Sequence, residues 1–271
     1  MDRLFKLLFV VLLATAIPAQ ALDTHGHTDH SAEVSKFMSE LKSDNGVYMV
    51  THNIDFYAGL AKGQKPKMTL VTCSDSRVQA NMFDRAPEGD LFTIRNIGNQ
   101  LATAEGSVEY GVHHLHTPIL MFLGHSRCGA IAAVGGNYSK ESAAIKKELD
   151  TINIPKEIGN LEGVTANVHN QVSLAMNKFS EEVADGDLVV IGAVMDFADD
   201  LHQGAGKLHV ININGEKDPA QLVNISALLA KNRPKPVAAK AEKKADAHEK
   251  PVAEHAKPDE HDAHAAPAAH H

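Results

Sequence analysis

The chain has 271 residues, which is enough for one good-sized domain or two small ones. Hydrophobic residues make up 44% of it, so most of the chain can build a buried core. The formal net charge is -8 and the sequence has no stripe of Lys and Arg. This charge pattern excludes the usual nucleic-acid-binding proteins, which follow the phosphate backbone with basic side chains.

The first 21 residues have the pattern of an export signal. Arg3 and Lys6 precede an apolar run, residues 7–17, and a small-x-small cleavage pattern ends at Ala21. A membrane anchor is the alternative, but the apolar run is shorter than the ~20 residues needed to span a bilayer. We therefore expect cleavage after Ala21, no stable membrane insertion, and a mature protein that is periplasmic or secreted.

Two helices are predicted after this signal. Residues 22–30 are polar and contain three histidines, which predicts a flexible segment. Apolar residues then recur with helical spacing, which predicts an amphipathic helix with an apolar face made of Val34, Phe37, Met38 and Leu41. A second, short helix is expected to end at Lys62, where Gly63 provides the stop.

The middle of the chain alternates between strand and helix patterns. Helices are expected around residues 108–115, from Cys128 onward, and over residues 161–183 and 219–231. Because strands separated by helices form parallel sheets, we predict an α/β fold with a mostly parallel central sheet flanked by helices. Four strands should be parallel and a fifth should lie at an edge. The expected strands are residues 68–72, 91–94, 119–123, 188–194 and 208–213.

Beyond residue 233 the composition changes to Ala, Lys, Glu, Asp, Pro and His. Such a segment has too little apolar surface to offset its ordering entropy, so residues 234–271 are predicted to be disordered. The tail either captures metal weakly or is simply solvated. Its histidines are His248, His255, His261, His264, His270 and His271. A single catalytic domain, residues 31–233, remains between the flexible ends.

The only two cysteines lie in short motifs that follow predicted strands. Cys73 opens the run CSDSR, and Cys128 closes the run GHSRC, in which His125 stands three residues earlier. Ligands of open α/β sheets bind at the carboxyl ends of strands. Two thiolates and one imidazole are three ligands that Zn²⁺ accepts, and an open fourth position is typical of catalytic zinc. The sequence therefore predicts a catalytic zinc site.

The two motifs have two other interpretations, a disulfide and the nucleophile of a serine hydrolase. An even number of cysteines in an exported chain first suggests a disulfide, here Cys73–Cys128. The polar neighbours of both cysteines favour a metal instead. The run GHSRC also approaches the nucleophile elbow of serine hydrolases, but Cys128 replaces the last glycine that the strained turn needs. We therefore reject a serine hydrolase.

Asp75 and Arg77 add a second layer to the predicted site. A carboxylate two residues after a zinc ligand can accept a hydrogen bond from a zinc-bound water, or it can coordinate the zinc itself. Arg77 can hold this carboxylate through a bidentate, charge-assisted pair. The alternative is an ordinary salt bridge within a loop.

Together, the two motifs resemble those of the β-class carbonic anhydrases. The resemblance extends to residues 61–67, 92–99 and 190–193, and it covers roughly residues 31–225 but not the His-rich ends. It implies the β-carbonic anhydrase fold and the reversible hydration of CO₂ to bicarbonate and a proton by zinc-bound hydroxide, with one Zn²⁺ per subunit. By this resemblance Cys73, His125 and Cys128 bind the zinc, and Asp75 with Arg77 forms the dyad beside the open position. Asp75 becomes a fourth ligand when the site is closed.

The resemblance also implies a substrate pocket and an assembly. Gln64 and the backbone of Gly129 would bind bicarbonate. Phe92, Ile97 and Tyr110 would line an apolar CO₂ pocket. Because this pocket is shared between subunits in the family, a homodimer or a higher homo-oligomer is implied.

The sequence departs from the family pattern in places. Met195 precedes Asp196 where the family usually has tyrosine, and Thr72 stands where alanine is frequent. The chain has no tryptophan for the noncatalytic bicarbonate site of some regulated members, which puts that site in doubt. Two alternative functions stay open at this point. One is a hydrolase of COS or CS₂ on the same scaffold, and the other is a non-catalytic protein that binds or buffers zinc with its His-rich ends.

Overall fold

The structure is a computed structural model, and it describes residues 29–231. The predicted export signal and the His-rich tail, residues 234–271, lie outside the described residues. Among the described helices, none is both long enough and apolar enough to cross a bilayer.

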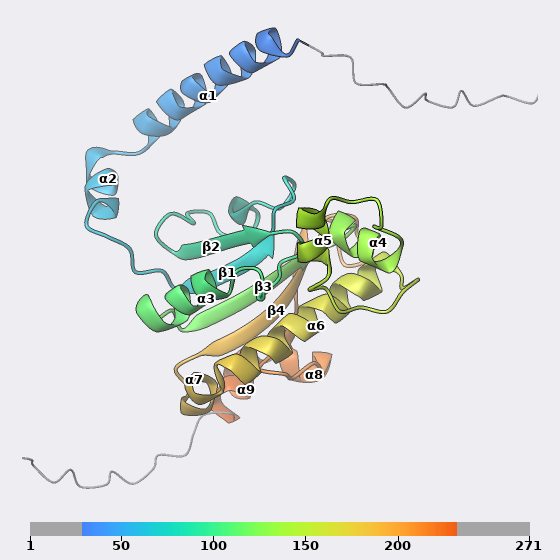
Figure 1. Ribbon diagram of the computed structural model, residues 1–271. Helices are drawn as coiled ribbons and strands as arrows, with labels where there is room; N and C mark the ends of the chain where they lie inside the picture. The colour runs from blue at the N-terminus through green and yellow to red at the C-terminus, as the bar shows by residue number, and fades with distance from the viewer. Residues whose placement is uncertain (1–28, 232–271) are drawn as a thin grey trace, which may run out of the picture.

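Five strands form one central sheet in the order β2-β1-β3-β4-β5 (Figure 1). The first four strands of the chain are parallel to one another, and β5 runs antiparallel to β4 at one edge. This confirms the predicted α/β class. Residues of β1, β3 and β4 are almost all buried, because helices cover both faces of a parallel sheet. The strands are β1 (Met68–Cys73), β2 (Leu91–Asn96), β3 (Ile119–His125), β4 (Val189–Asp196) and β5 (Lys207–Ile213).

The long helix α6 (Asn160–Lys178) packs across β3 and β4 (Figure 1). Its buried face carries Val164, Val168 and Val172, which recur every four residues and fill the core above the sheet. Shorter elements surround the sheet. They are α3 (Glu105–Glu109), the π-helical turn η2 (Tyr110–His114), α4 (Gly129–Gly135), α5 (Ala143–Leu149), α7 (Ser180–Asp185) and the 3₁₀ turn η1 (Ala80–Met82).

Two helices that we expected to be continuous are divided. The helix expected over residues 161–183 ends at Lys178, because Phe179 leaves the helical backbone and buries its ring completely beneath the turn to α7. The closing helix is split into α8 (Pro219–Leu222) and α9 (Ile225–Lys231). Between them the side chain of Asn224 accepts a hydrogen bond from the backbone of Ala227, as a helix cap does.

The two N-terminal helices lie apart from the sheet (Figure 1). α1 (Ser31–Thr51) and α2 (Ile54–Leu60) confirm the predicted helices, but within the described chain none of their residues is buried. The Tyr48 hydroxyl donates a 2.7 Å hydrogen bond to Glu88 and thereby links α1 to the body. The predicted apolar face of α1 remains uncovered, since Val34, Phe37, Met38 and Leu41 are 45–58% exposed.

Gly111 in η2 is required by close packing. A Cβ atom at this position would lie 2.1 Å from the Thr69 hydroxyl oxygen, which is buried in a 2.8 Å hydrogen bond with Thr117. We expect Gly111→Ala to lower the free energy of unfolding by about 1–3 kcal/mol through overpacking. Urea unfolding of the purified variant measures this.

Gly106→Ala in α3 is the matched control. A Cβ atom there meets nothing within 4 Å, so it should raise the free energy of unfolding by about 0.5–1 kcal/mol by restricting the unfolded chain. Equal free energies of unfolding for Gly111→Ala and Gly106→Ala would show that η2 does not approach β1 this closely.

Candidate metal centre

Three buried side chains meet at the carboxyl ends of two neighbouring parallel strands. Cys73 is the last residue of β1 and His125 is the last residue of β3. Cys128 follows as the residue before α4. The two sulfur atoms and a ring nitrogen of His125 all lie within 4.8 Å of one another, and all three residues are buried. Both cysteines are free thiols rather than a disulfide, so the alternative pairing that their even number suggested is absent from the described structure.

The environment of His125 fits a metal ligand. Its Nδ1 lies 3.0 Å from the carbonyl oxygen of Ser126. Because a carbonyl only accepts, Nδ1 carries the proton and Nε2 keeps a free lone pair. Nε2 is buried and has no hydrogen-bond partner within the described residues. A buried lone pair beside two sulfur atoms needs a cation, and two thiolates with one imidazole are a donor set for zinc.

The two thiols are electrostatically coupled. The pKa of Cys73 is lowered, chiefly because its sulfur accepts a hydrogen bond from Cys128, with a smaller contribution from the backbone of Gly98. Burial opposes this shift. The pKa of Cys128 is raised, first because its proton is held by Cys73 and then because the thiol is buried. The two shifts have opposite directions because the sulfurs share one hydrogen bond, and a bound dication would displace the proton between them.

Asp75 lies beside the three donors and is held by Arg77. The Nε and Nη2 atoms of Arg77 donate to the two carboxylate oxygens at 2.9 and 2.7 Å, and the backbone N–H of Arg77 adds a third bond at 3.0 Å. These bonds hold the pKa of the Asp75 carboxyl well below its usual range. Its Oδ2 remains 3.8 Å from Nε2 of His125. Asp75 is thus ionised and adjacent to the metal donors, paired with Arg77 as expected for an open site.

Nothing in the sequence alone assigns a role to Arg95, although Arg95 lies in residues 92–99, one of the segments that resemble the β-class carbonic anhydrases. Its Nε donates to the carbonyl oxygen of Cys73 at 3.1 Å and its Nη2 to that of Asp75 at 2.6 Å. One guanidinium on β2 therefore fixes the backbone turn that presents both side chains. The signal in the sequence is weak, because only the pairing of β2 with β1 brings Arg95 beside Cys73.

The predicted pocket residues divide into two groups. Ile97 packs in one apolar cluster with both cysteines, and Gly129 begins α4 directly after Cys128. The rings of Phe92 and Tyr110 lie 5.7 Å apart, but Phe92 is four residues before Asn96, the partner of Cys73 in the sheet. Four strand residues span about 13 Å.

Gln64 is also distant from the metal donors of its own chain. It precedes β1, whereas Cys73 ends that strand, so the length of β1, about 16 Å, separates them. Within one chain Gln64, Phe92 and Tyr110 are thus not brought to the metal donors.

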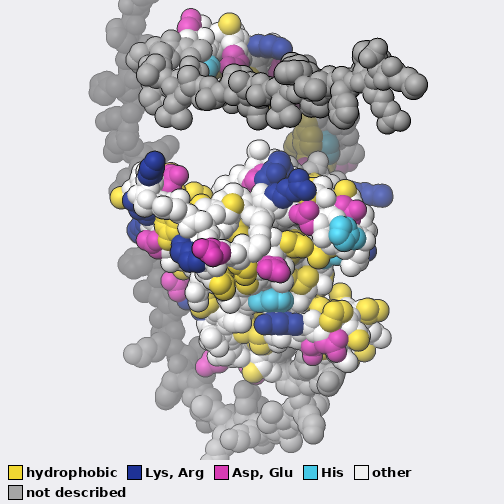
Figure 2. All heavy atoms as spheres, turned by 90° about the vertical axis from the view of Figure 1, so that its right-hand side faces the viewer, with side chains coloured by type: hydrophobic (Ala, Val, Ile, Leu, Met, Phe, Trp, Pro, Cys, Tyr) yellow, Lys and Arg dark blue, Asp and Glu magenta, His cyan; other side chains and the backbone are white. Residues whose placement is uncertain are grey.

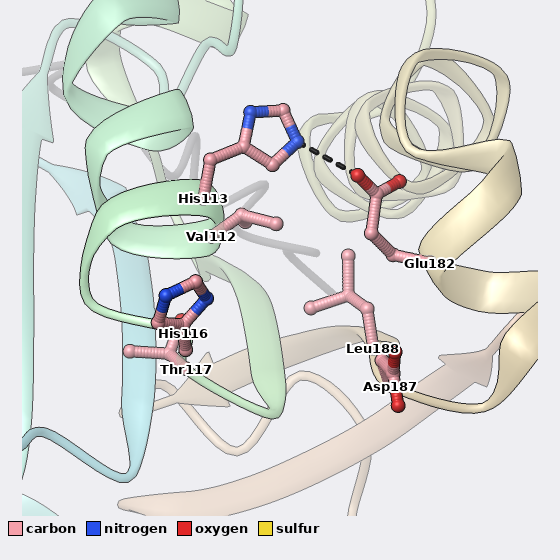
Figure 3. Close-up of a pocket in the computed structure, with 7 residues that line it drawn as sticks. All are labelled: Val112, His113, His116, Thr117, Glu182, Asp187 and Leu188. Atoms are coloured by element: carbon pink, nitrogen blue, oxygen red, sulfur yellow. Dashed lines mark hydrogen bonds and ion pairs between the residues drawn. The ribbon is translucent and has the colours of Figure 1, made fainter. Parts of the chain in front are cut away.

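A cavity of about 440 Å³ lies at the end of the sheet opposite the metal donors (Figure 3). Thr117 and Leu188, which precede β3 and β4, line it, and Nε2 of His113 lies 2.8 Å from the Glu182 carboxylate across its rim. Figure 2 shows another face of the molecule, where basic and acidic side chains are interspersed and form no continuous band on the side drawn.

Comparisons with known proteins agree with this geometry. The sequence pattern of the family described as "Carbonic anhydrase" matches residues 68–208. Carbonic anhydrase 2 of Mycobacterium tuberculosis is 30% identical over 164 residues, which are 55% of this chain and 79% of the relative. Carbonic anhydrase of Synechococcus elongatus is 36% identical over 103 residues, which are 35% of this chain and 38% of that one.

Solved structures give the same fold. A tetrameric β-carbonic anhydrase of Sordaria macrospora superimposes with a TM-score of 0.55 at 26% identity, covering 66% of this chain and 98% of that one. The β-carbonic anhydrase CcaA superimposes with a TM-score of 0.56 at 21% identity, covering 69% of this chain and 94% of that one.

The family match spans more than half of the 271 residues and includes the cluster of Cys73, His125 and Cys128. The chain therefore belongs to the carbonic anhydrase family, in its β class, and catalyses the reversible, zinc-dependent hydration of CO₂ to bicarbonate.

Proposed function

We propose that Cys73, His125 and Cys128 hold the catalytic zinc of this carbonic anhydrase. The observation that carries the proposal is that a ring nitrogen of His125 and two sulfurs lie within 4.8 Å of one another, while the buried Nε2 has no hydrogen-bond partner among the described residues. Zinc in such a site lowers the pKa of a coordinated water to about 7 and so supplies a nucleophile at neutral pH. The remaining chemistry belongs to the side chains around the cluster.

Asp75 and Arg77 act as a pair in this proposal. The Asp75 carboxylate only accepts hydrogen bonds, because Arg77 keeps it ionised. It can therefore orient the attacking water through that water's proton. Arg77 donates two side-chain bonds to the carboxylate and a third to the carbonyl oxygen of Arg127 at 3.2 Å. This fixes the carboxylate on one side of the cluster and leaves the other side to substrate.

Ile97 and Gly129 form the part of the substrate pocket that this chain supplies near its own metal donors. Ile97 packs against the apolar cluster that contains both cysteines, which suits CO₂ because CO₂ has no net dipole and displaces water readily from an apolar surface. Gly129 offers a backbone N–H next to Cys128, which is suited to hold bicarbonate.

The rest of the pocket is proposed to come from a second copy of the chain in a homodimer. Gln64, Phe92 and Tyr110 lie too far along the strands to reach the metal donors of their own chain, as the strand lengths above require. β2 is an edge strand, and the apolar face of α1 is uncovered, so both offer surface to a partner. The Sordaria macrospora structure is described as tetrameric, which supports an oligomer here.

Phe37→Glu is expected to break this assembly. A charge in the middle of the apolar face of α1 cannot be buried without a partner charge, so the variant should elute as a monomer and lose most of its CO₂ hydration. Size-exclusion chromatography with light scattering measures the mass. Ser43→Glu, an exposed position on the opposite side of α1, is the matched control and should keep the wild-type mass. Equal masses for the two variants would remove α1 from the interface.

We also propose that residues 1–21 are removed on export and that the mature enzyme works in the periplasm. Support comes from the sequence alone, in the basic start, the apolar run and the cleavage pattern at Ala21. Amino-terminal sequencing of the protein from a periplasmic fraction tests this. A mature chain that begins at residue 1, or protein found only in the cytoplasm, would contradict it.

Stopped-flow CO₂ hydration over a pH series, with zinc measured on the same sample, tests the proposed function. We expect activity in proportion to zinc, near one ion per chain, and an increase in rate as the pH passes about 7. Activity that is independent of metal content would overturn the proposed site.

A further inference from the structure

One face of α6 carries three carboxamides that the mechanism does not use. Asn160, Asn167 and Gln171 stand at i, i+7 and i+11, so they lie in a line along the helix. We call them the amide stripe. Asn167 and Gln171 are at most 2% exposed, although buried polar groups cost free energy unless their hydrogen bonds are satisfied. Their partners therefore indicate what the stripe does.

Asn160 binds both backbone groups of a metal-donor residue. Its Oδ1 accepts a hydrogen bond from the Cys128 N–H at 3.1 Å, and its Nδ2 donates to the Cys128 carbonyl oxygen at 3.0 Å. These two hydrogen bonds, one on each side of the Cα atom, restrict the backbone rotation of Cys128. Because the sulfur is only two bonds from that Cα, the clamp also restricts where the sulfur points.

Asn167 and Gln171 bind the turn that follows β2. Asn167 Nδ2 donates to the Gly98 carbonyl oxygen at 3.0 Å, and Gln171 Oε1 accepts from the Leu101 N–H at 2.8 Å. Gln100 joins these two side chains, with 2.8 Å bonds to each of them. All members of this network are buried, and the four bonds named above connect α6 to residues 98–101.

This turn lies against Cys73, and the Asn96 side chain closes it by donating to the Gln100 carbonyl at 2.6 Å and accepting from the Gln100 N–H at 2.7 Å. Asn96 pairs with Cys73 in the sheet and its carbonyl accepts a hydrogen bond from the Ser74 N–H at 2.9 Å. Gly98 and Asn99 then adopt left-handed backbone angles, with φ values of 76° and 52°. Two such residues in succession are uncommon outside tight turns. The amides of α6 add two bonds to the backbone of this turn and tie it to the helix.

We infer that Asn160 and Asn167 are positioning residues of the metal centre, because one helix thereby ties the backbone of Cys128 and the turn beside Cys73 to a single rigid support. Seven helical residues separate them, a span of about 10.5 Å. Val164 and Val168, between the two asparagines, are buried against the sheet and keep α6 fixed. The spacing of the two sulfurs is thus set by a helix that carries neither of them. This inference rests on the proposed zinc-binding role of the cysteines.

The test is the zinc affinity of Asn160→Ala in the full chain, measured by competition with a chromogenic chelator. Loss of groups that orient metal ligands typically weakens metal binding about 10- to 100-fold, and we expect a loss in this range. The Co²⁺-substituted protein gives a second readout, since its visible absorption reports the geometry of the thiolate ligands. The absorption of Asn160→Ala should shift from that of the wild type.

Asn170→Ala is the matched control on the same helix. Asn170 Nδ2 also donates to a backbone carbonyl, that of Asn153 at 2.6 Å, but away from the metal donors. Its zinc affinity and Co²⁺ spectrum should equal those of the wild type. Asn160→Ala with unchanged zinc affinity, or with a loss no larger than that of Asn170→Ala, would overturn the inference.

Two further variants keep the outcomes separate. Asn167→Ala should weaken zinc binding in the same range, and if this buried variant does not fold, the comparison of Asn160→Ala with Asn170→Ala decides. Cys73→Ala tests the proposed function itself. If Cys73→Ala retains wild-type zinc affinity, the metal centre is wrong. If Cys73→Ala loses zinc while Asn160→Ala binds zinc as tightly as the wild type, the metal centre stands and the positioning role of Asn160 is wrong.

Discussion

Cys73→Ala and His125→Ala are each expected to lose both the bound zinc and CO₂ hydration. Two donors do not replace three in a tetrahedral zinc site, and loss of either residue leaves only two of the three clustered donors. Without the metal, the pKa of water returns from about 7 to 15.7, which lowers the ionised fraction at neutral pH by about eight orders of magnitude. The rate should fall to that of the uncatalysed reaction.

Elemental analysis and stopped-flow hydration on one sample measure both losses. His113→Ala is the matched control, because His113 is a histidine with a carboxylate partner at 2.8 Å but lies by the cavity at the other end of the sheet (Figure 3). It should keep zinc and activity. Full activity in zinc-free Cys73→Ala would refute the metal centre, and a loss of zinc in His113→Ala would show that the ligands are elsewhere.

The position of this centre follows from features that a sequence reveals well. Five apolar runs of four to seven residues predict strands, and Cys73 and His125 come at the ends of two of them. In a parallel sheet these ends meet at one edge, so two motifs 52 residues apart in the chain come together. Asp75 and Arg77 are only two residues apart, so their ion pair could also be predicted from local spacing.

Other contacts depend on tertiary packing that the sequence does not reveal. Arg95 reaches the carbonyl oxygens of Cys73 and Asp75 only because β2 pairs with β1 in one particular register. The break at Phe179 likewise reflects burial of a ring that helical periodicity alone would place within a continuous helix. The amide stripe of α6 has the correct period, but polar residues at that period resemble a solvated face until their partners are known.

The apolar face of α1 shows a third limit. Its periodicity correctly predicts a helix, yet within the described chain the face packs against nothing. An amphipathic pattern indicates that a helix has a buried side, but not which chain buries it. The same ambiguity affects Gln64, Phe92 and Tyr110. Their resemblance to family positions implies a pocket, while the single chain keeps them far from its metal donors.

Arg77→Met is expected to leave zinc bound but to lower CO₂ hydration about 10- to 100-fold, as loss of an orienting partner typically does. Arg77 makes two side-chain bonds to Asp75, at 2.9 and 2.7 Å, and methionine keeps an unbranched side chain but has neither the charge nor the donors. The freed carboxylate, with its Oδ2 already 3.8 Å from Nε2 of His125, can then turn toward the three metal donors. There it would compete with the water that reacts with CO₂. None of the three metal donors is lost, so zinc should stay bound.

The combination of retained metal and reduced rate distinguishes this effect from loss of a ligand. Zinc content by elemental analysis should equal that of the wild type, and kcat should fall more than zinc affinity does. Arg127→Met is the matched control, since Arg127 is an arginine in the neighbouring loop after β3 whose side chain contacts Asp200 at 3.4 Å instead of Asp75. It should retain the wild-type rate. If Arg77→Met is as active as Arg127→Met, the prediction is wrong. The Asp75 carboxylate would then keep its position without the Arg77 guanidinium.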